Sequence, residues 1–489
     1  MYKLFLKIHI SVFNPFSLSI EETVTISKRE YDYLKRENAE LKHALSEALI
    51  LINNFQLEVN NLRTEIQLLK NGRNSRTSST PSSHDYGRSN KYNSREKSGR
   101  KPGGQKGHKG SSLKMSQNPD ETIKYFPKYC NQCGEEFNSA SVSELHERKQ
   151  EVVIPPIIPK YVEHQSYRCR CHNCNTETVS DLPLNLKANI QYGNNIQALI
   201  SYLSVYQYLP SNRIKSFFND VMNLPISEGT IYNILESMSK KAEPTYKTIE
   251  GLITKSRVVG GDESGVKING NKAWFWVFQN SLLTYIKVAY SRGYESIIET
   301  FSNGFPNSVY VSDSLAAQLK IATKSKQLCL AHLLRELSNF EDAFNCTRAS
   351  EMKQLFKSAI LHKKEMDTID YFQVSKKVKE FENKLSELLE YDYSNKHKKQ
   401  KAFINRLMKN RNNIFTFLYY HEVPPDNNGS ERAIRNAKVK MKISNQFKSF
   451  DFANHYAVIR SVIDTTIKNS NDVFGALSSL AEQKLVTAE

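Results

Sequence analysis

Two pairs of cysteines have the spacing of a metal site. Cys130 and Cys133 form the first pair, Cys171 and Cys174 form the second, and 37 residues separate them. Four thiolates around one ion make a structural zinc site, because no coordination position is left open for a substrate. Five of the seven cysteines lie in this region, and an odd total argues against a secreted disulfide framework. The spacing predicts structural Zn²⁺. Cys169 could replace Cys171, and a set of reduced buried cysteines is the simpler alternative.

Three carboxylates occupy positions from which they could hold divalent cations. Asp262 lies within VVGGDESGVKI, which reads as a strand, and Asp313 ends the strand-like NSVYVSDS. Glu431 lies near the start of DNNGSERAIRNAKVKMK, which reads as a helix. Phosphodiester cleavage by two metals needs carboxylates that converge on Mg²⁺, and strand ends with a facing helix can supply that convergence. Composition alone does not select these three from 51 acidic residues, most of which are surface or capping groups.

Positive charge is concentrated in one segment. The 489 residues include 68 basic and 51 acidic ones, a net charge of +17 that suggests a polyanionic partner such as nucleic acid. Residues 71–115 hold eleven Lys or Arg, two acids and almost no apolar side chains, which predicts a disordered linker. Glycines flank its basic residues Arg100, Lys101, Lys106 and Lys109, so the linker can lie along phosphates or enter a minor groove. A solvated linker without a ligand is the alternative.

Residues 31–69 carry an unbroken heptad repeat. The a positions are Tyr31, Asn38, Leu45, Ile52, Val59 and Ile66, and the d positions are Leu34, Leu41, Ala48, Phe55, Leu62 and Leu69. β-branched residues at a with mainly leucine at d favour a parallel dimeric coiled coil, and the asparagine at a would fix its register. A helix packed on its own domain is the alternative, but its apolar stripe would drift from a strict 3.5-residue period.

The first 20 residues are apolar, with Lys3 and Lys7, and weakly resemble a signal peptide. Pro15 interrupts them and no small-residue cleavage site follows. We predict a disordered arm, or sequence upstream of the true start. No run of about 18 apolar residues occurs in the chain, which excludes a membrane-spanning helix.

Periodicity indicates the remaining elements. Residues 151–169 read as strand-like, and could bring the cysteine pairs together. Residues 190–245 read as helical, with Ser211 and Ser227 as candidate caps of two helices joined by a short turn. That arrangement is compatible with helix-turn-helix DNA binding, although an ordinary helical hairpin gives the same pattern. From Val258 three hairpin-linked strands precede helices (292–305, 315–322) that alternate with strands, the last being 326–332. This is the order of an RNase H-like core, and Lys-rich helices follow in 346–424.

The order of these parts resembles a DDE transposase of the insertion sequence 66 family, over about residues 22–480. The most specific block is DNNGSERAIRNAKVKMKISNQFKSF, and the family's C-x-x-H matches Cys329 to His332. The resemblance implies a catalytic triad of Asp262, Asp313 and Glu431 that binds Mg²⁺ or Mn²⁺. It implies that His332 approaches the scissile phosphate or positions a carboxylate, although a buried histidine with a satisfied hydrogen bond is equally compatible.

The resemblance also implies partners. They are DNA, both the inverted-repeat ends of the element and its target, a second copy of the chain or a higher oligomer, and accessory proteins of the same element. The helix after Glu431 carries basic residues suited to phosphates, or to a solvated face, namely Arg432, Arg435, Lys438, Lys440 and Lys442. Asn427 and Asn428 are candidate caps of that helix. Ser264 and Ser314 replace residues commoner in the family, which suggests a divergent subgroup. We expect a cytoplasmic, nucleoid-associated bacterial protein.

Together these observations predict a multidomain α+β protein. The expected parts are a flexible arm (1–25), a coiled coil (26–70), a basic disordered linker (71–117), a zinc-binding domain (118–185), a helical domain (186–255), an RNase H-like α/β core (256–345 and 425–475) with a helical insertion (346–424), and a tail (476–489). The predicted function is metal-dependent DNA strand cleavage and strand transfer. The alternatives are a non-catalytic, zinc-dependent DNA-binding regulator and a decayed transposase that binds DNA without cutting it.

Overall fold

The computed structural model describes residues 2–9, 19–71, 107–110, 112–139, 141, 143–183, 186, 188–344, 346–371, 375–393 and 397–483. Contacts divide the chain into two units. The first comprises Met1–Tyr92 and Leu330–His421, and the second comprises Asn93–Cys329 and Glu422–Glu489. Among the described residues, no helix is both long enough and apolar enough to cross a membrane.

A five-stranded mixed sheet lies at the centre of the second unit, with the strand order β7-β6-β5-β8-β9. Its strands are β5 (Val258–Ile268), β6 (Asn271–Gln279), β7 (Thr284–Ala289), β8 (Phe305–Ser312) and β9 (Thr323–Leu328). The first three pair antiparallel, and β8 pairs parallel with both β5 and β9. Asn269 and Gly270, both at positive φ, form the two-residue turn between β5 and β6. The predicted order of three hairpin-linked strands followed by later strands is therefore present.

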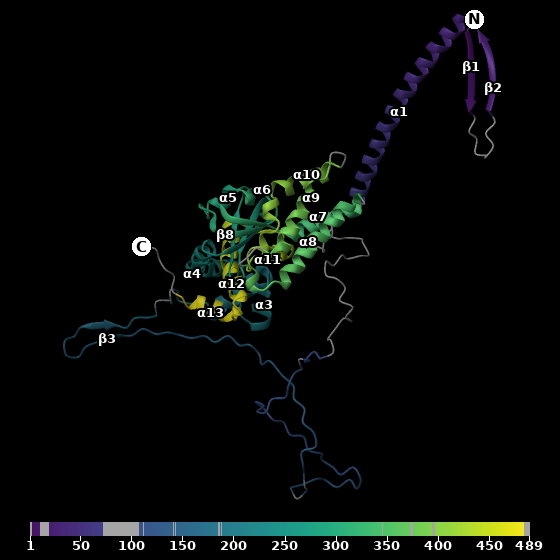
Figure 1. The fold of residues 1–489 in the computed structure, drawn as a ribbon. Coiled ribbons are helices and arrows are strands. Elements are labelled where there is room, and N and C mark those ends of the chain that lie inside the picture. Colours follow the sequence, from purple (N-terminus) through teal and green to yellow (C-terminus); the bar gives the residue numbers. More distant parts are fainter. Residues whose placement is uncertain are drawn as a thin grey trace. The chain divides into compact units, whose positions relative to one another are not determined.

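Helices α2 (Asn194–Ser201), α4 (Glu228–Thr254), α12 (Phe450–Lys468) and α13 (Val473–Glu482) share one hydrophobic core with this sheet. Figure 1 shows α4, α12 and α13 in the same body as β8. The expectation of a separate helical domain at 186–255 was therefore wrong, because these helices have no core of their own. The expected tail was wrong as well, since Leu477 and Leu480 are buried and residues up to Glu482 are helical.

The helices and helix caps predicted from local sequence were partly correct. Helix α3 (Ser211–Met222) precedes α4, but Pro210 holds its N-cap position and Ser211 is already helical, so the predicted cap was wrong. Ser227 does cap α4, because its side chain accepts a hydrogen bond from the Thr230 amide. A π-helix, η2 (Tyr202–Tyr206), follows α2. The helices expected at 292–305 and 315–322 are only the short α5 (Glu295–Ile298) and α6 (Ala316–Leu319).

The knuckle region carries little regular structure. Its only strands in the described part are β3 (Arg168–Arg170) and β4 (Glu177–Val179), which pair antiparallel. In Figure 1 this stretch of chain runs extended around β3. The strand predicted across residues 151–169 is absent before Arg168, where apolar side chains such as Val152, Ile154 and Ile158 are exposed. Pro155, Pro156 and Pro159 interrupt that run, and each removes a donor from any strand ladder.

The first unit begins with a hairpin rather than the disordered arm that was expected. Strands β1 (Tyr2–His9) and β2 (Ser19–Ile26) pair antiparallel, with Tyr2 opposite Ile26. Helix α1 (Lys28–Asn71) follows, and Figure 1 shows it as one unbroken rod. Ser27 and Glu30 start α1 with reciprocal side-chain to backbone hydrogen bonds, the arrangement of a capping box. The heptad side chains Leu41, Ile52 and Leu62 are exposed along it, so dimerisation stays a prediction.

The rest of the first unit is helical, as expected for the insertion. It holds α7 (Leu330–Phe344), α8 (Thr347–Glu365), η3 (Thr368–Tyr371), α9 (Lys376–Glu390), α10 (Lys398–Lys409), η4 (Arg411–Asn413) and η5 (Thr416–Leu418). The boundary lies after Cys329 instead of after residue 345. Helix α7 joins this unit because Phe340 packs edge-to-face on Phe403 and Glu336 pairs with Arg406 at 2.6 Å.

Candidate active site

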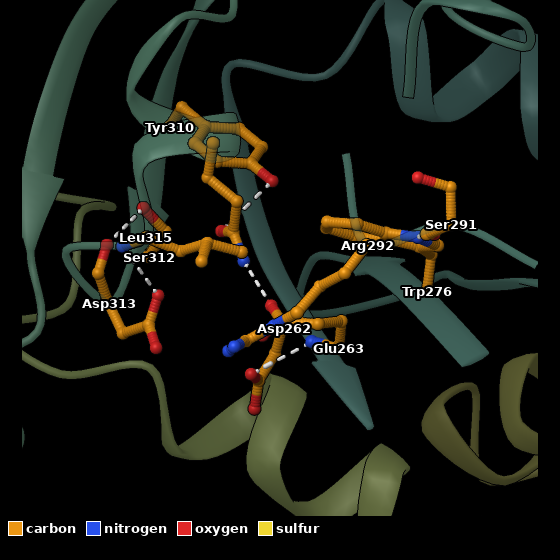
Figure 2. A network of polar contacts seen from close by, with 10 residues as sticks. Asp262, Glu263, Trp276, Ser291, Arg292, Tyr310, Ser312, Asp313 and Leu315 are labelled. Carbon is orange, nitrogen blue, oxygen red and sulfur yellow. Dashed lines mark hydrogen bonds and ion pairs between the residues drawn. The ribbon is translucent and has the colours of Figure 1, made fainter. Parts of the chain in front are cut away.

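Three carboxylates meet at one end of the sheet in the second unit. Asp262 and Glu263 are consecutive on β5, and Asp313 follows the last residue of β8. Each offers an oxygen within 4.8 Å of the other two. Figure 2 shows the three side chains gathered in one polar network. The pairing of β5 with β8 is parallel, so both strands deliver these acids to the same edge.

Asp262 is the most perturbed carboxyl of this group. Desolvation by burial raises its pKa well above the ordinary value, and the negative charges of Glu263, Asp313 and Glu431 raise it further. The backbone amide of Glu263 donates to its Oδ1 at 2.9 Å and opposes the shift. A half-buried, poorly solvated acid near three other acids has a strong tendency to keep a proton or to bind a cation.

Glu263 is held by fixed partners. The Arg292 guanidinium donates to Oε1 from Nε at 2.9 Å and from Nη2 at 2.5 Å, and Gln318 donates to Oε2 at 2.6 Å. The Tyr310 hydroxyl donates to Gln318 at 3.4 Å, so Gln318 is itself oriented. Figure 2 shows Arg292 reaching across to Glu263. Burial and Asp313 raise the pKa of Glu263, while Arg292 opposes them.

Asp313 is fixed by the turn that follows β8. Its Oδ1 accepts the Leu315 backbone amide at 3.0 Å, and its carbonyl oxygen accepts the Ser312 hydroxyl at 2.9 Å. Asp313 and Leu315 thus form a local side-chain to backbone bridge typical of aspartate in turns.

Helix α11 (Asn428–Ser444) carries Glu431 in its first turn. Asn427 precedes the helix and occupies the cap position, but its side chain caps no helix amide. It donates instead to the carbonyl oxygen of Gly261 at 2.7 Å and accepts the Ser430 hydroxyl at 2.7 Å. These bonds tie the start of α11 to the residue before Asp262. Glu431 lies outside the 4.8 Å group, and it acts on Asp262 through its charge.

Glycines in β5 allow this close approach. A Cβ at Gly260 would lie 2.5 Å from Gln279 Nε2, 2.8 Å from Ser430 Oγ and 2.9 Å from Asn427 Oδ1. A Cβ at Gly261 would collide with the Tyr310 hydroxyl. No residue with a side chain fits at either position without displacing the elements that carry the acids.

A half-buried lysine extends the same scaffold to α12. Lys468 donates to Gln279 Oε1 at 2.8 Å, and Gln279 in turn donates to the Ser430 hydroxyl at 3.3 Å. Burial lowers the pKa of Lys468 to about 8. The chain of bonds therefore runs from α12 through β6 to α11 and β5, which fixes the end of the sheet where the acids lie.

His332 belongs to the other unit, near the start of α7, so its predicted role stays a prediction. The strand expected at 326–332 ends at Leu328, because the chain turns into α7 at Leu330. Cys329 remains in the second unit, where its sulfur accepts the Asn427 backbone amide at 3.2 Å.

The predicted DNA-binding residues divide into three groups. Arg100, Lys101 and Lys106 lie outside the described residues, and Lys109 is exposed. On α11 the exposed residues are Arg432, Arg435, Lys438 and Lys442. Lys440 is buried, and its ammonium donates to the carbonyl oxygens of Ser204 and Leu209 at 3.3 and 3.4 Å. Its assignment to DNA was wrong, because it satisfies carbonyls at the end of the π-helix and burial lowers its pKa to about 8.

The two cysteine pairs adopt the same turn. The Cys130 amide donates to Glu135 O at 2.8 Å and its carbonyl accepts the Gly134 amide at 2.9 Å. The second pair repeats both bonds, from Cys171 to Thr176 O at 2.9 Å and from Asn175 to Cys171 O at 2.8 Å. Gly134 and Asn175 have positive φ at equivalent places.

This geometry favours thiolates. Hydrogen bonds from the backbone of Cys133 and Gln132 lower the pKa of Cys130, and the Thr176 side chain lowers the pKa of Cys174. The structure does not bring the two pairs together, since none of these cysteines belongs to a ligand cluster found among the described residues. A shared zinc ion remains a prediction.

The acids at the sheet edge fit a divalent cation. Asp262 and Asp313 carry carboxylate oxygens, the donor type that Mg²⁺ and Mn²⁺ prefer, whereas Glu431, the third acid expected from the sequence, lies outside this group. Burial raises the pKa of Asp262, and the negative charges of Glu263, Asp313 and Glu431 add to that shift. Glu263 fits less well, because Arg292 and Gln318 engage both of its oxygens.

Several residues of this site were missed from the sequence. Glu263, Arg292, Gln318, Gln279 and Lys468 were not singled out. Only the glycine pair before Asp262 offered a signal, since adjacent glycines in a strand indicate close backbone approach. The other residues are polar side chains far apart in the chain, and only the fold makes them neighbours.

A model of the transposase IS66 family matches residues 189–455, which is more than half of the chain and includes all four acids. No curated protein matches the chain.

Proposed function

The chain belongs to the transposase IS66 family, and we propose that it binds the terminal inverted repeats of its element and catalyses metal-dependent strand cleavage and strand transfer. The observation that carries the proposal is that a carboxylate oxygen of Asp262 lies within 4.8 Å of those of Glu263 and Asp313. The half-buried Asp262 carboxyl is acted on by three further acids, from β5, the end of β8 and α11. Placing several acids close together lowers the stability of the folded protein, and it is useful where a divalent cation is bound.

We assign the metal ligands as Asp262, Asp313 and Glu431. A bound Mg²⁺ or Mn²⁺ would activate the attacking oxygen and stabilise the leaving oxygen at the scissile phosphate. Glu263 acts as a positioning residue, because Arg292 and Gln318 hold its carboxylate in place beside Asp262. Asn427 sets the distance between α11 and β5 through Gly261.

The reaction has two displacements at phosphorus. Water attacks the phosphodiester at the element's end, the bond to the 3′-oxygen breaks, and that oxygen leaves as a 3′-hydroxyl. The freed 3′-hydroxyl then attacks a phosphodiester of the target, whose own 3′-oxygen leaves. Each displacement forms one phosphorus–oxygen bond and breaks another, so strand transfer needs no cofactor beyond the cation.

In this proposal, the other parts of the chain support the core, form the oligomer and contact DNA. The sheet with its helices is an RNase H-like core, and Leu330–His421 is its helical insertion. The exposed heptad side chains of α1, among them Leu41 and Ile52, form the seam of a homodimer or higher oligomer. The cysteine knuckles hold a structural Zn²⁺, and the basic linker with the exposed α11 residues contacts DNA phosphates. Accessory proteins of the same element complete the machinery.

The test is cleavage of a duplex that carries the element's end, with Mg²⁺ and the accessory proteins present. Wild type, Asp262→Asn and the surface control Asp220→Asn are compared, and DNA binding is followed in parallel. Cleavage by wild type and the control, with binding but no cleavage by Asp262→Asn, is expected. Binding without cleavage by all three would favour a regulator or a decayed transposase instead.

A further inference from the structure

We propose that the outer face of the β5–β6 hairpin, defined by Lys267, Lys272 and Trp274, binds the phosphate backbone of a DNA strand beside the active site. This inference rests on the proposed function and assigns a DNA-contacting surface outside both α11 and the basic linker.

The hairpin has one covered face and one open face. Val266, Ile268 and Ala273 point into the core and are at most 4% exposed. The neighbouring positions Gly265, Lys267 and Lys272 are exposed. Side chains alternate between the faces of a strand, so these exposed positions and Trp274 share the second face. That face is open to solvent and accessible to a ligand.

The strand register places two lysines directly opposite each other. Lys267 of β5 pairs with Lys272 of β6, next to the Asn269–Gly270 turn. Like charges at directly opposed positions destabilise a sheet. Among the described residues, no acidic side chain forms an ion pair with either lysine. The repulsion is relieved when an anion lies between the two ammonium groups, which is a physical reason for the pair to bind phosphate.

A hollow adjoins this lysine pair. It has a volume of about 800 Å³, and its lining includes Lys267, Lys272, Gly270 and Gln446. None of its lining residues is acidic. The Gln446 side chain accepts the Gly270 amide at 2.8 Å, and Phe447 forms a parallel bridge with Ile268. The hairpin tip is therefore fixed, and its lysines are presented on a rigid support.

Basic and aromatic side chains on the open face extend from the lysine pair towards Glu263. The Lys272 ammonium lies 4.7 Å from the centre of the Trp274 ring, and the Arg292 guanidinium lies 5.0 Å from the same ring. Arg292 binds Glu263, which is next to Asp262. Basic groups thus continue along this face from the hairpin tip to Glu263, the chain neighbour of Asp262, and are complementary to a DNA strand that passes the edge of the active site.

The experiment measures DNA binding against salt concentration with the full chain. The probes are a labelled duplex carrying the element's terminal repeat and a duplex of scrambled sequence. The variant is Lys267→Ala/Lys272→Ala. Its matched control is Lys240→Ala/Lys247→Ala on α4, which removes the same charge from two exposed lysines. The conservative variant Lys267→Arg/Lys272→Arg keeps the charge.

We expect the alanine pair to lower the slope of log affinity against log salt by about 2, and to weaken binding about tenfold, on both duplexes. The control and the arginine pair should match wild type. Thermal melting should show the alanine pair to be as stable as wild type or more so, because the opposed charges are gone. An unchanged slope, or an equal change in the control, would overturn this inference and leave the transposase proposal intact. Failure of wild type to bind either duplex at low salt would overturn both.

Discussion

The side-chain amide of Asn427 donates to the backbone carbonyl oxygen of Gly261 at 2.7 Å. One bond thereby joins the residue before Asp262 to the start of the helix that carries Glu431. The two residues are far apart in the chain, and their contact sets the separation of the proposed catalytic acids.

Asn427→Ala should destabilise the second unit by about 1–3 kcal/mol, because the buried Gly261 carbonyl loses its side-chain donor and the Ser430 hydroxyl loses its acceptor. Cleavage should fall more than DNA binding, since the helix that carries Glu431 is no longer held. Urea unfolding and cleavage assays check this. Asn428→Ala is the matched control, because in the described part of the chain its side chain makes no hydrogen bond. Equal effects of the two variants would contradict the assigned role.

Gly260→Ala should destabilise the protein by about 1–3 kcal/mol, because the new methyl group overlaps Gln279, Ser430 and Asn427. Gly265→Ala on the same strand is the control, since its Cβ would find only Trp274, at 3.8 Å. Melting temperatures of the two variants provide the comparison. A Gly260→Ala protein as stable as the control would mean that α11 packs on β5 less closely than described.

The stability of the metal-free protein should fall as pH rises from about 4. The pKa of Asp262 is raised on folding, so the folded state binds more protons than the unfolded state until pH passes the folded pKa, and stability decreases across that window. Asp262→Asn should flatten this dependence and raise the melting temperature at neutral pH. Melting curves against pH, with Asp220→Asn as control, measure it.

Mg²⁺ should stabilise the wild-type protein at neutral pH by about 2.7 kcal/mol at a concentration one hundred times its Kd. The gain should vanish in Asp262→Asn and shrink in Glu431→Gln. Glu263→Gln should keep most of it, because Arg292 and Gln318 already engage that carboxylate. Thermal shift against Mg²⁺ concentration gives the readout, and an equal loss in Glu263→Gln would make Glu263 a ligand.

Purified protein should contain about one Zn²⁺ per chain. Cys130→Ser/Cys171→Ser should lose it, whereas Cys346→Ser, which lies in the other unit, should retain it. Cys169→Ser separates the two coordination sets left open by the sequence. Mass spectrometry measures the zinc content of each variant. A metal-free protein with intact knuckle cysteines would refute the site.

Ile52→Asp should convert the protein to a smaller assembly in light scattering, because it places a charge in the heptad seam. Leu57→Asp is the control. Leu57 is 63% exposed and Ile52 is 52% exposed, but only Ile52 occupies an a position. Equal masses for both variants and wild type would remove the coiled-coil prediction.

Periodic elements were predictable because each signal is local. The heptad of α1, the turn at Asn269–Gly270 and the Ser227 cap are read from residues a few positions apart. The predicted domain boundaries were wrong where tertiary packing determines them. Helix α7 joined the insertion and α13 joined the core, since their apolar faces contact residues distant in sequence.

The sequence by itself determined the family and the order of the strands, and it singled out Asp262, Asp313 and Glu431 as the acids proposed here. The tertiary structure alone decided that Lys440 is buried, that Arg292 binds Glu263, and that Asn427 reaches Gly261. The physical reason is that a side chain's charge, exposure and partner depend on groups brought close by folding. No local pattern of residue types encodes those distances.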